Sequence, residues 1–417
     1  MGALSLLRGN RNYRHLFTAS AISNLGDGVS ALAFPWLATL ITRDPLLISL
    51  VAFSTRLPWF LLSIPAGVWT DRFDRQRLMV WADITRFGLM GVVIALISGV
   101  AAFPVPETQA LGMIAALSGL AFLLGCAEVL RDNAAQTALP SVVAKGDLEQ
   151  ANGQMWSVEQ IMGSLVGPPL AGVLIAIAVP AAFLLDAVTF ALAALLVWRM
   201  TFPPRARPAR RSMRVEAGEA WAWMRGHPVI LRLAVMLGLL NALNLSVLTM
   251  LALYAQEVLE LSAIGYGLLL TSEAVGGVLA GVFGPALVAR VGRARSLHVA
   301  LGIIAVAFAL IGLVPAWPVV AAALMASMFA GVWWNVVTVS YRQRIIPDAL
   351  LGRVNALYRF FGWGIMPAGV LGAGWLVAAL EPGLGQPAAL RVMYLLAGAG
   401  GAGLWLYALI RLRDLPQ

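Results

Sequence analysis

Acidic side chains occur inside apolar runs long enough to cross a membrane, where a charge is costly and usually serves a function. Asp27 lies in the first such run, and Glu128 and Asp132 lie in the fourth. On a helix Glu128 and Asp132 are four residues apart and share a face, with Arg131 beside them. Neighbouring carboxylates raise each other's proton affinity and an arginine lowers it, so such a group can take up and release a proton. We therefore expect these acids to couple to protons, Asp27 first because it lies deepest in its run.

Each of these acids also has a structural interpretation. Glu128 and Asp132 can form a static network that anchors the end of their span, because the span ends only a turn or two later. Asp27 can be a hydrogen-bonded acid at a break in its helix. The sequence leaves both interpretations open.

Other polar and aromatic residues in the apolar runs are candidates to line a substrate cavity. They are Asn24, Arg56, Arg131, Trp334, Asn335 and Arg359. Glu273 is the candidate acid of the second half for contact with substrate or proton. Arg56 can balance Asp27 or meet an anionic substrate. Asp83 and Arg86 are three residues apart, so we expect an internal ion pair between them.

Composition determines the solvent in which these runs lie. Of the 417 residues 60% are hydrophobic and 12% are charged, whereas a soluble domain carries about 25% charged residues. So few charges cannot cover a water-exposed surface, and the lipid bilayer is therefore the expected surrounding. The net charge is +9, but the basic residues form short arginine clusters between apolar runs, which is typical of cytoplasmic loops and argues against a nucleic acid partner.

The sequence offers no pattern typical of an enzyme or a metalloprotein. It has no phosphate-binding loop with Gly-Lys-Ser/Thr, so ATP-driven transport is not encoded. The three histidines show no metal-ligand spacing, and the single Cys126 allows no disulfide. We expect no cofactor, no metal and no catalytic residues.

A window of about 20 apolar residues, which crosses a hydrocarbon core of about 30 Å, predicts about twelve helices. The expected spans are 16–41, 46–70, 78–101, 109–139, 151–178, 180–202, 229–257, 263–289, 296–314, 319–345, 353–380 and 390–411. Arginines gather in every second connection, which the positive-inside rule places in the cytoplasm together with both termini. The fold class is an all-α membrane protein with two six-helix bundles.

Internal repetition supports two bundles. The segment 136–140 and Asn152 are echoed by 343–347 and Asn355, six spans later. We expect an N-terminal bundle at 1–202, a cytoplasmic linker at 203–228 and a C-terminal bundle at 229–417. The linker has a possible amphipathic helix from Met213 to Met224.

The loop between the second and third spans reads GVWTDRFDRQR over 67–77. This sequence resembles the signature loop of the major facilitator superfamily. The resemblance implies a conformational latch made by Gly67, Asp71, Arg72, Arg75 and Arg77. Gly67 permits close helix approach, and Asp71 can accept charge-assisted hydrogen bonds.

The fifth span resembles the Gly-x-x-x-Gly-Pro motif of antiporters in that superfamily. It reads GSLVGPPLAG from Gly163 to Gly172. Gly163 and Gly167 form a small-residue face for tight packing, while Pro168 removes a backbone donor and favours a kink. The resemblance implies export against a proton gradient.

Further segments at 24–27 and 128–136, and Asp186, resemble the subgroup with enterobactin-exporter-like and macrolide or multidrug efflux proteins. The resemblance implies a proton-coupled, monomeric exporter of a lipophilic or amphipathic small molecule (drug, antibiotic or siderophore) in a bacterial inner membrane. Nutrient or metabolite uptake by the same fold is the alternative within transporters. A membrane receptor or assembly partner that transports nothing is the alternative from another class.

Overall fold

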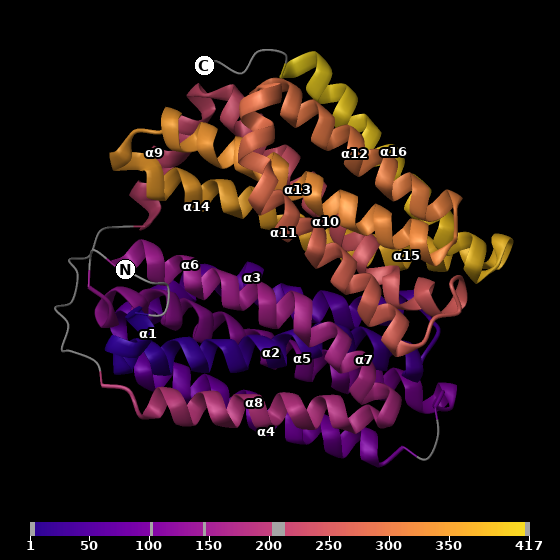
Figure 1. Cartoon of the computed structure of the whole chain (residues 1–417). Coiled ribbons are helices and arrows are strands. Elements are labelled where there is room, and N and C mark those ends of the chain that lie inside the picture. The colour runs from indigo at the N-terminus through magenta and orange to yellow at the C-terminus, as the bar shows by residue number, and fades with distance from the viewer. Residues whose placement is uncertain (1–4, 101–102, 145–146, 202–212, 413–417) are drawn as a thin grey trace. The chain divides into compact units, whose positions relative to one another are not determined.

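The computed structural model describes residues 5–100, 103–144, 147–201 and 213–412. Within those ranges the regular elements are helices and there is no β-strand (Figure 1). The all-α fold class predicted from composition is confirmed.

The helices follow the order of the predicted spans. The first half contains α1 Ser5–Gly9, α2 Arg11–Ile41, α3 Pro45–Arg72, α4 Arg75–Ser98, α5 Glu107–Val142, α6 Leu148–Glu159, the π-helix η2 Gln160–Val166, α7 Gly167–Ile177 and α8 Val179–Trp198. The second half contains α9 Met213–Gly226, α10 Pro228–Glu257, α11 Ala263–Val291, α12 Arg293–Leu313, α13 Trp317–Ile345, α14 Asp348–Gly364, α15 Met366–Leu384 and α16 Gln386–Arg411.

Eleven segments of the described chain are long and apolar enough to cross a membrane, and α2 is not among them. Asn24 and Asp27 lower the hydropathy of α2 below that of the other spans. Its 31 residues nevertheless measure about 46 Å, which exceeds the hydrocarbon thickness. Because α2 also packs along α7 and α8, we treat it as the twelfth span.

The chain divides into two compact units. The first comprises residues 1–43, 50–209 and 262–271, and the second comprises 44–49, 210–261 and 272–417. These units differ from the expected bundles in the short segments 44–49 and 262–271. Between the two halves of the sequence, α9 occupies the position where the linker helix is expected.

The fifth span is interrupted where Pro168 removes a backbone donor. The helix changes to π geometry over Gln160–Val166 and returns to α geometry at Gly167. The eleventh span is interrupted at Ile365, between α14 and α15 and two residues before Pro367. A proline cannot donate to the carbonyl four residues before it, so both interruptions follow from the sequence.

Glycines bring α2 against the interrupted span. A Cβ added at Gly28 would overlap the backbone of Gly163, and one added at Gly167 would lie 2.6 Å from the Cα of Gly28. The tight packing predicted for Gly163 and Gly167 is therefore present. In the second unit, a Cβ at Gly369 of α15 would likewise overlap the backbone of Ala242 on α10.

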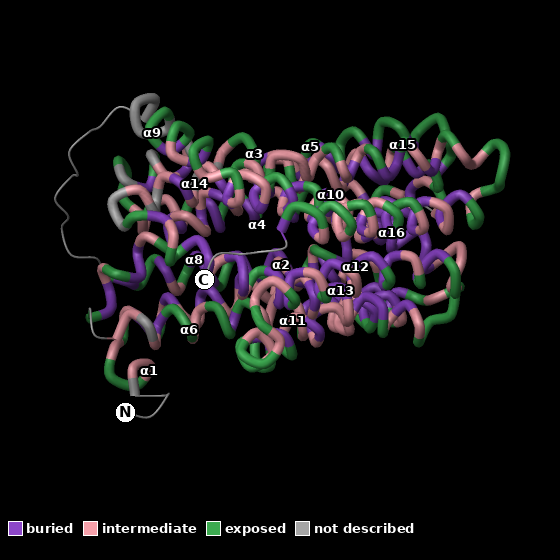
Figure 2. The backbone as a smooth tube through the Cα atoms, turned by 90° about the horizontal axis from the view of Figure 1, so that it is seen from above, coloured by how far each residue is buried: buried purple, intermediate pink, exposed green. Residues whose placement is uncertain are grey.

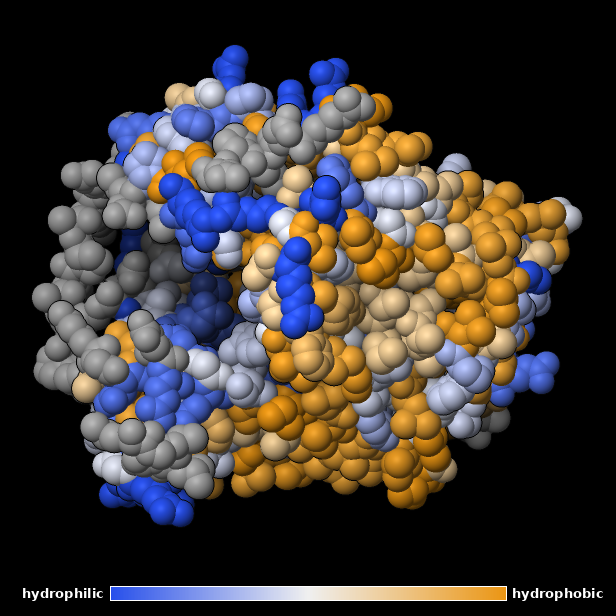
Figure 3. Space-filling model, turned by 45° about the horizontal axis from the view of Figure 1, so that its top comes forward, coloured by the Kyte–Doolittle hydropathy of each residue, from blue (hydrophilic) through white to orange (hydrophobic). Residues whose placement is uncertain are grey.

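Burial follows helical periodicity in both units. On α15, buried Val370, Ala373, Gly374 and Val377 recur every three or four residues, and exposed residues lie between them (Figure 2). Many of the exposed residues are large and apolar, such as Trp198, Trp375 and Ile410. Hydrophobic side chains cover much of the face shown in Figure 3. An apolar exterior of this kind suits lipid and not water.

Candidate functional site

The core of the candidate site is the guanidinium of Arg86 on α4. It donates to the carboxylate of Asp27 on α2 and, at 3.2 Å, to the hydroxyl of Ser23 one turn earlier. The guanidinium carbon also lies 3.8 Å from the ring centroid of Phe190 on α8. Arg86 therefore connects three helices, and α8 packs along both α2 and α4 (Figure 1).

A second arginine, Arg131 of α5, lies in the same cluster. Asp83 of α4 is 3.7 Å from Arg131 Nε and 3.8 Å from Arg86 Nη1. Asp132 is 3.6 Å from Arg131 Nη1. Asp83 thus lies between two arginines, and the ion pair predicted between Asp83 and Arg86 is confirmed.

The two kinds of charge differ in their exposure. The side chains of Arg86 and Arg131 are 3% and 2% exposed, whereas Asp27 and Asp132 are 25% and 30% exposed. The arginines are therefore buried behind carboxylates that border open space. A proton or a cationic group that reaches the cluster would meet the acids first.

Asp83 is fully buried, and neither of its carboxylate oxygens has a hydrogen-bond partner within the described chain. Arg86 Nε and Arg131 Nε are likewise buried without hydrogen-bond partners there. Asp83 is held by charge alone at distances near 4 Å. Buried polar atoms normally find partners, so this cluster is incompletely satisfied in the arrangement described.

Asp186 of α8 is a further buried acid with different surroundings. It accepts a hydrogen bond from the Ser30 hydroxyl of α2 and contacts Thr189 Oγ1 at 3.4 Å. Among the described residues no arginine, lysine or histidine forms an ion pair with it. A Cβ added at Gly26 would overlap both Asp186 and Thr189, so Gly26 permits this contact between α2 and α8.

The other predicted acids and Arg56 fall into different positions. Glu128 is half-buried on α5, one turn from Asp132, and close enough to Asp27 and Arg86 for their charges to interact. The expectation that Arg56 balances Asp27 is wrong, because Asp27 binds Arg86 and Arg56 is exposed on α3. Arg86 is nearer because α4 packs along α8 beside α2.

The arginine-rich turn after α3 is anchored by one of its residues. Arg75 Nη1 donates to the carbonyl of Thr137 and lies 3.2 Å from Ser141 Oγ, and both partners are on α5. Arg72 and Arg77 are exposed, and the side chain of Asp71 lies outside the described part. The close helix approach expected at Gly67 is not present, since a Cβ added there would meet no atom within 4 Å.

The remaining predicted residues are dispersed. Asn24 is half-buried on α2, one turn before Gly28. In the second unit, Glu273 is half-buried on α11, Trp334 is buried on α13 beside exposed Asn335, and Arg359 is exposed on α14. These four residues of the second unit lie on three different helices.

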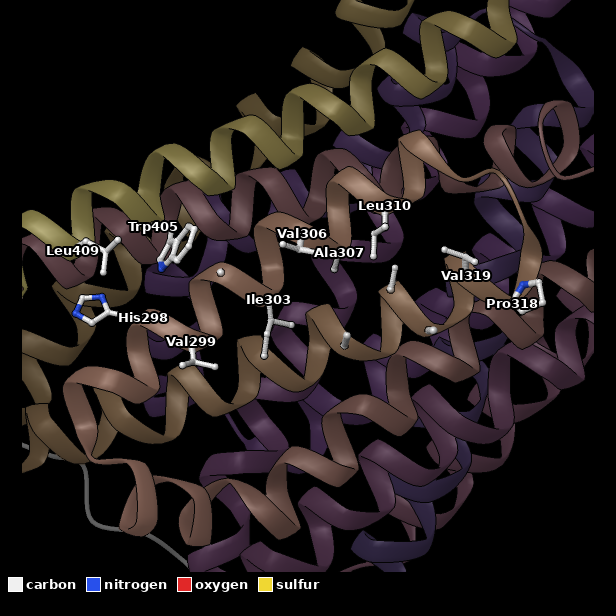
Figure 4. Close-up of a pocket in the computed structure, with 14 residues that line it drawn as sticks. His298, Val299, Ile303, Val306, Ala307, Leu310, Pro318, Val319, Trp405 and Leu409 are labelled. Atoms are coloured by element: carbon white, nitrogen blue, oxygen red, sulfur yellow. The ribbon is translucent and has the colours of Figure 1, made fainter.

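The second unit contains a cavity of about 800 Å³ between α12, α13 and α16. Figure 4 shows His298, Trp405 and Leu409 at one end and Pro318 and Val319 at the other. No acid or arginine lines it. Its lining is mostly apolar, with the His298 imidazole at one end, and suits hydrocarbon.

Comparison with known proteins supplies the family. The family model described as transmembrane secretion effector matches residues 1–409. The chain belongs to that family. It is therefore a multi-pass membrane transporter of the major facilitator type, as the loop at 67–77 and the motif at 163–172 indicated.

Similar proteins include efflux systems. The enterobactin exporter EntS of Citrobacter koseri is 25% identical over 364 residues, which cover 85% of this chain and 82% of the relative. The multidrug efflux pump Tap of Mycobacterium tuberculosis is 27% identical over 379 residues, covering 87% and 86% respectively. A bacterial homologue of the iron transporter ferroportin, solved in an inward-facing state, shares the fold with a TM-score of 0.73 at 19% identity, covering 96% of this chain and 99% of the other.

Sequence reasoning omitted three members of this transporter's cluster from the candidate site. Asp83 and Arg86 were interpreted only as an internal pair, and Asp186 only as part of a family resemblance. A signal for all three was available, because each is an ionisable residue within an apolar span. Their shared location was not predictable, since it depends on how α4 and α8 pack against α2.

Proposed function

We propose that this transporter exports a lipophilic or amphipathic small molecule in exchange for protons, by alternating access of its two bundles. The observation that carries the proposal is the Asp27–Arg86 pair, whose acid borders open space inside an apolar bundle. A charge in that position is costly and is retained where it serves transport. The efflux function of the relatives EntS and Tap supports the direction.

Asp27 is the proposed site of proton entry. Protonation would neutralise its carboxylate and weaken its hold on Arg86, so each protonation state would favour a different arrangement of α2 and α4. Cargo that binds the arrangement with unprotonated Asp27 would then move across the membrane in the direction opposite to the proton. The charges of Glu128 and Asp132 interact with that of Asp27, and both acids are proposed to contribute to proton or cargo binding.

The motif around Gly163 and Gly167 supports antiport by its position. It packs on Gly28, the residue next to Asp27. A change in the charge at Asp27 would therefore act on the contact between α2 and the interrupted fifth span. We further propose that the chain lies in a bacterial inner membrane as a monomer with both termini in the cytoplasm, as the arginine distribution indicates.

The test is substrate-dependent proton movement in proteoliposomes that contain the purified chain. A panel of cationic, neutral and anionic amphiphiles is presented with an imposed pH gradient, and internal pH and cargo are both followed. Cargo movement opposite to the proton supports export by antiport, and movement in the same direction indicates uptake. Folded protein that moves neither across the panel would contradict the proposal and favour a role without transport.

A further inference from the structure

Asp186 and Asp27 are two acids close to one arginine. Arg86 binds Asp27 and lies over the ring of Phe190, and Phe190 is four residues after Asp186 on α8. Residues four apart on a helix are neighbours on one face. The charges of Arg86 and Asp186 accordingly interact, although the two side chains form no ion pair. Arg86 is thus near a second carboxylate.

The two acids differ in what neutralises them. Asp27 has the guanidinium of Arg86, whereas Asp186 has only the hydroxyls of Ser30 and Thr189. Asp186 is also fully buried, at 0% exposure. An ionised carboxylate without a cation is very costly in such surroundings, and a group of this kind becomes neutral instead.

We propose that Asp186 holds a proton while Arg86 binds Asp27, and that Arg86 exchanges between the two acids during the transport cycle. This inference rests on the proposed proton coupling, which it extends by naming the second acid. When Asp27 takes up a proton it releases Arg86. Arg86 then binds Asp186, which ionises and releases its own proton. Each arrangement holds one proton and one ion pair, so charge in the core is conserved.

The surroundings of Asp186 allow this exchange. α8 packs against α2, α4 and α7. From α2 the facing ionisable group is Asp27, from α4 they are Arg86 and the neighbouring Asp83, and α7 contains no ionisable residue. Arg131 does not compete for Asp186, because it pairs with Asp83 and Asp132. Arg86 is therefore the cation of the described cluster placed to reach Asp186.

The exchange can be tested without knowing the cargo. A protonated carboxylic acid absorbs in the infrared as a carbonyl band distinct from the bands of a carboxylate. The purified full chain in lipid bilayers is measured at neutral pH as wild type, Asp186→Asn and Asp27→Asn. Glu107→Gln, which changes an exposed acid at the start of α5, serves as the control.

The expected result is specific to each variant. The wild type shows a carboxylic acid band that is lost in Asp186→Asn and kept in Glu107→Gln. Asp27→Asn also loses the band, because the released Arg86 binds and ionises Asp186. Loss in Asp186→Asn with retention in Asp27→Asn would refute the exchange. An identical band in wild type and Asp186→Asn would refute protonation of Asp186.

A second variant tests the same assignment if Asp186→Asn does not fold. Ser30→Ala removes the hydroxyl that donates to Asp186 but retains the acid. The carbonyl band should then shift, since a hydrogen bond to the acid is lost, and an unshifted band would contradict the assignment. These spectra report protonation and not transport. A negative cargo screen would therefore leave this result standing, and a negative spectrum would leave the transport result standing.

Discussion

Arg86 on α4 binds Asp27 on α2, so the acid expected to couple transport to protons has its counter-ion on another helix. The pair joins two spans through a bond that protonation can break. A salt bridge within one helix would differ, because breaking it would not change the contact between two spans.

Removal of Arg86 should destabilise the first unit strongly. Arg86→Gln leaves Asp27 without its cation and leaves Asp83 with Arg131 alone, and breaking a buried pair costs about 3–5 kcal/mol. Thermal unfolding in detergent measures the loss. Arg86→Gln combined with Asp27→Asn should recover part of it, because the uncompensated charge at Asp27 is gone. Equal stability of the single and double variants would show that the pair contributes no coupling.

Neutralisation of Asp27 should uncouple cargo transport from the proton gradient. Asp27→Asn removes the proposed proton acceptor, so gradient-driven transport in proteoliposomes should fall to background. Cargo exchange without a gradient should persist, since this substitution removes a charge and not the fold of the two bundles. Glu107→Gln is the matched control, because Glu107 is an exposed acid at the start of α5 in the same unit. Gradient-driven transport at the wild-type rate in Asp27→Asn would remove Asp27 from the mechanism.

The glycine contact between α2 and the fifth span should tolerate no side chain. Gly28→Ala places a Cβ against the backbone of Gly163, and overpacking of this kind costs about 1–3 kcal/mol. A lower melting temperature and reduced yield are expected. Gly88→Ala on α4 is the control, since a Cβ there would meet no atom within 4 Å. Equal melting temperatures for the two variants would contradict the contact.

The anchoring of the arginine-rich turn depends on Arg75. Arg75→Ala removes hydrogen bonds to Thr137 and Ser141 on α5, each worth roughly 1.5–3 kcal/mol when the donor is charged. We expect lower stability and slower cargo exchange. Arg199→Ala, at an exposed position in the same unit, should change neither. If both variants behave as wild type, the turn is not a latch.

Orientation in the membrane can be tested through the single cysteine. In a Cys126→Ser background, Phe73→Cys places a thiol at an exposed position between α3 and α4, and Ala316→Cys places one between α12 and α13. The arginine distribution predicts that these two connections lie on opposite sides of the membrane. An impermeant maleimide should label Ala316→Cys in intact cells and Phe73→Cys only after permeabilisation. The reverse pattern would invert the topology predicted from the arginines.

The sequence by itself determined the class of the protein and most of its spans. The reason is that lipid imposes a strong local constraint: about 20 apolar residues per span, with arginines at alternate connections. The interruption near Pro168 was also predictable, because it follows from a missing backbone donor. The tight packing of Gly163 and Gly167 was expected from their spacing, though their partner Gly28 was not.

Tertiary structure alone decided which charges meet. Local spacing gives the pair Asp83–Arg86, because three residues place both on one helical face. It cannot give Asp27–Arg86 or Ser30–Asp186, whose partners are 59 and 156 residues apart. Those contacts depend on the packing of α8 against both α2 and α4, where the absence of a Cβ at Gly26 makes room for Asp186. Interactions between helices depend on distances in space, and a linear pattern of charges does not contain them.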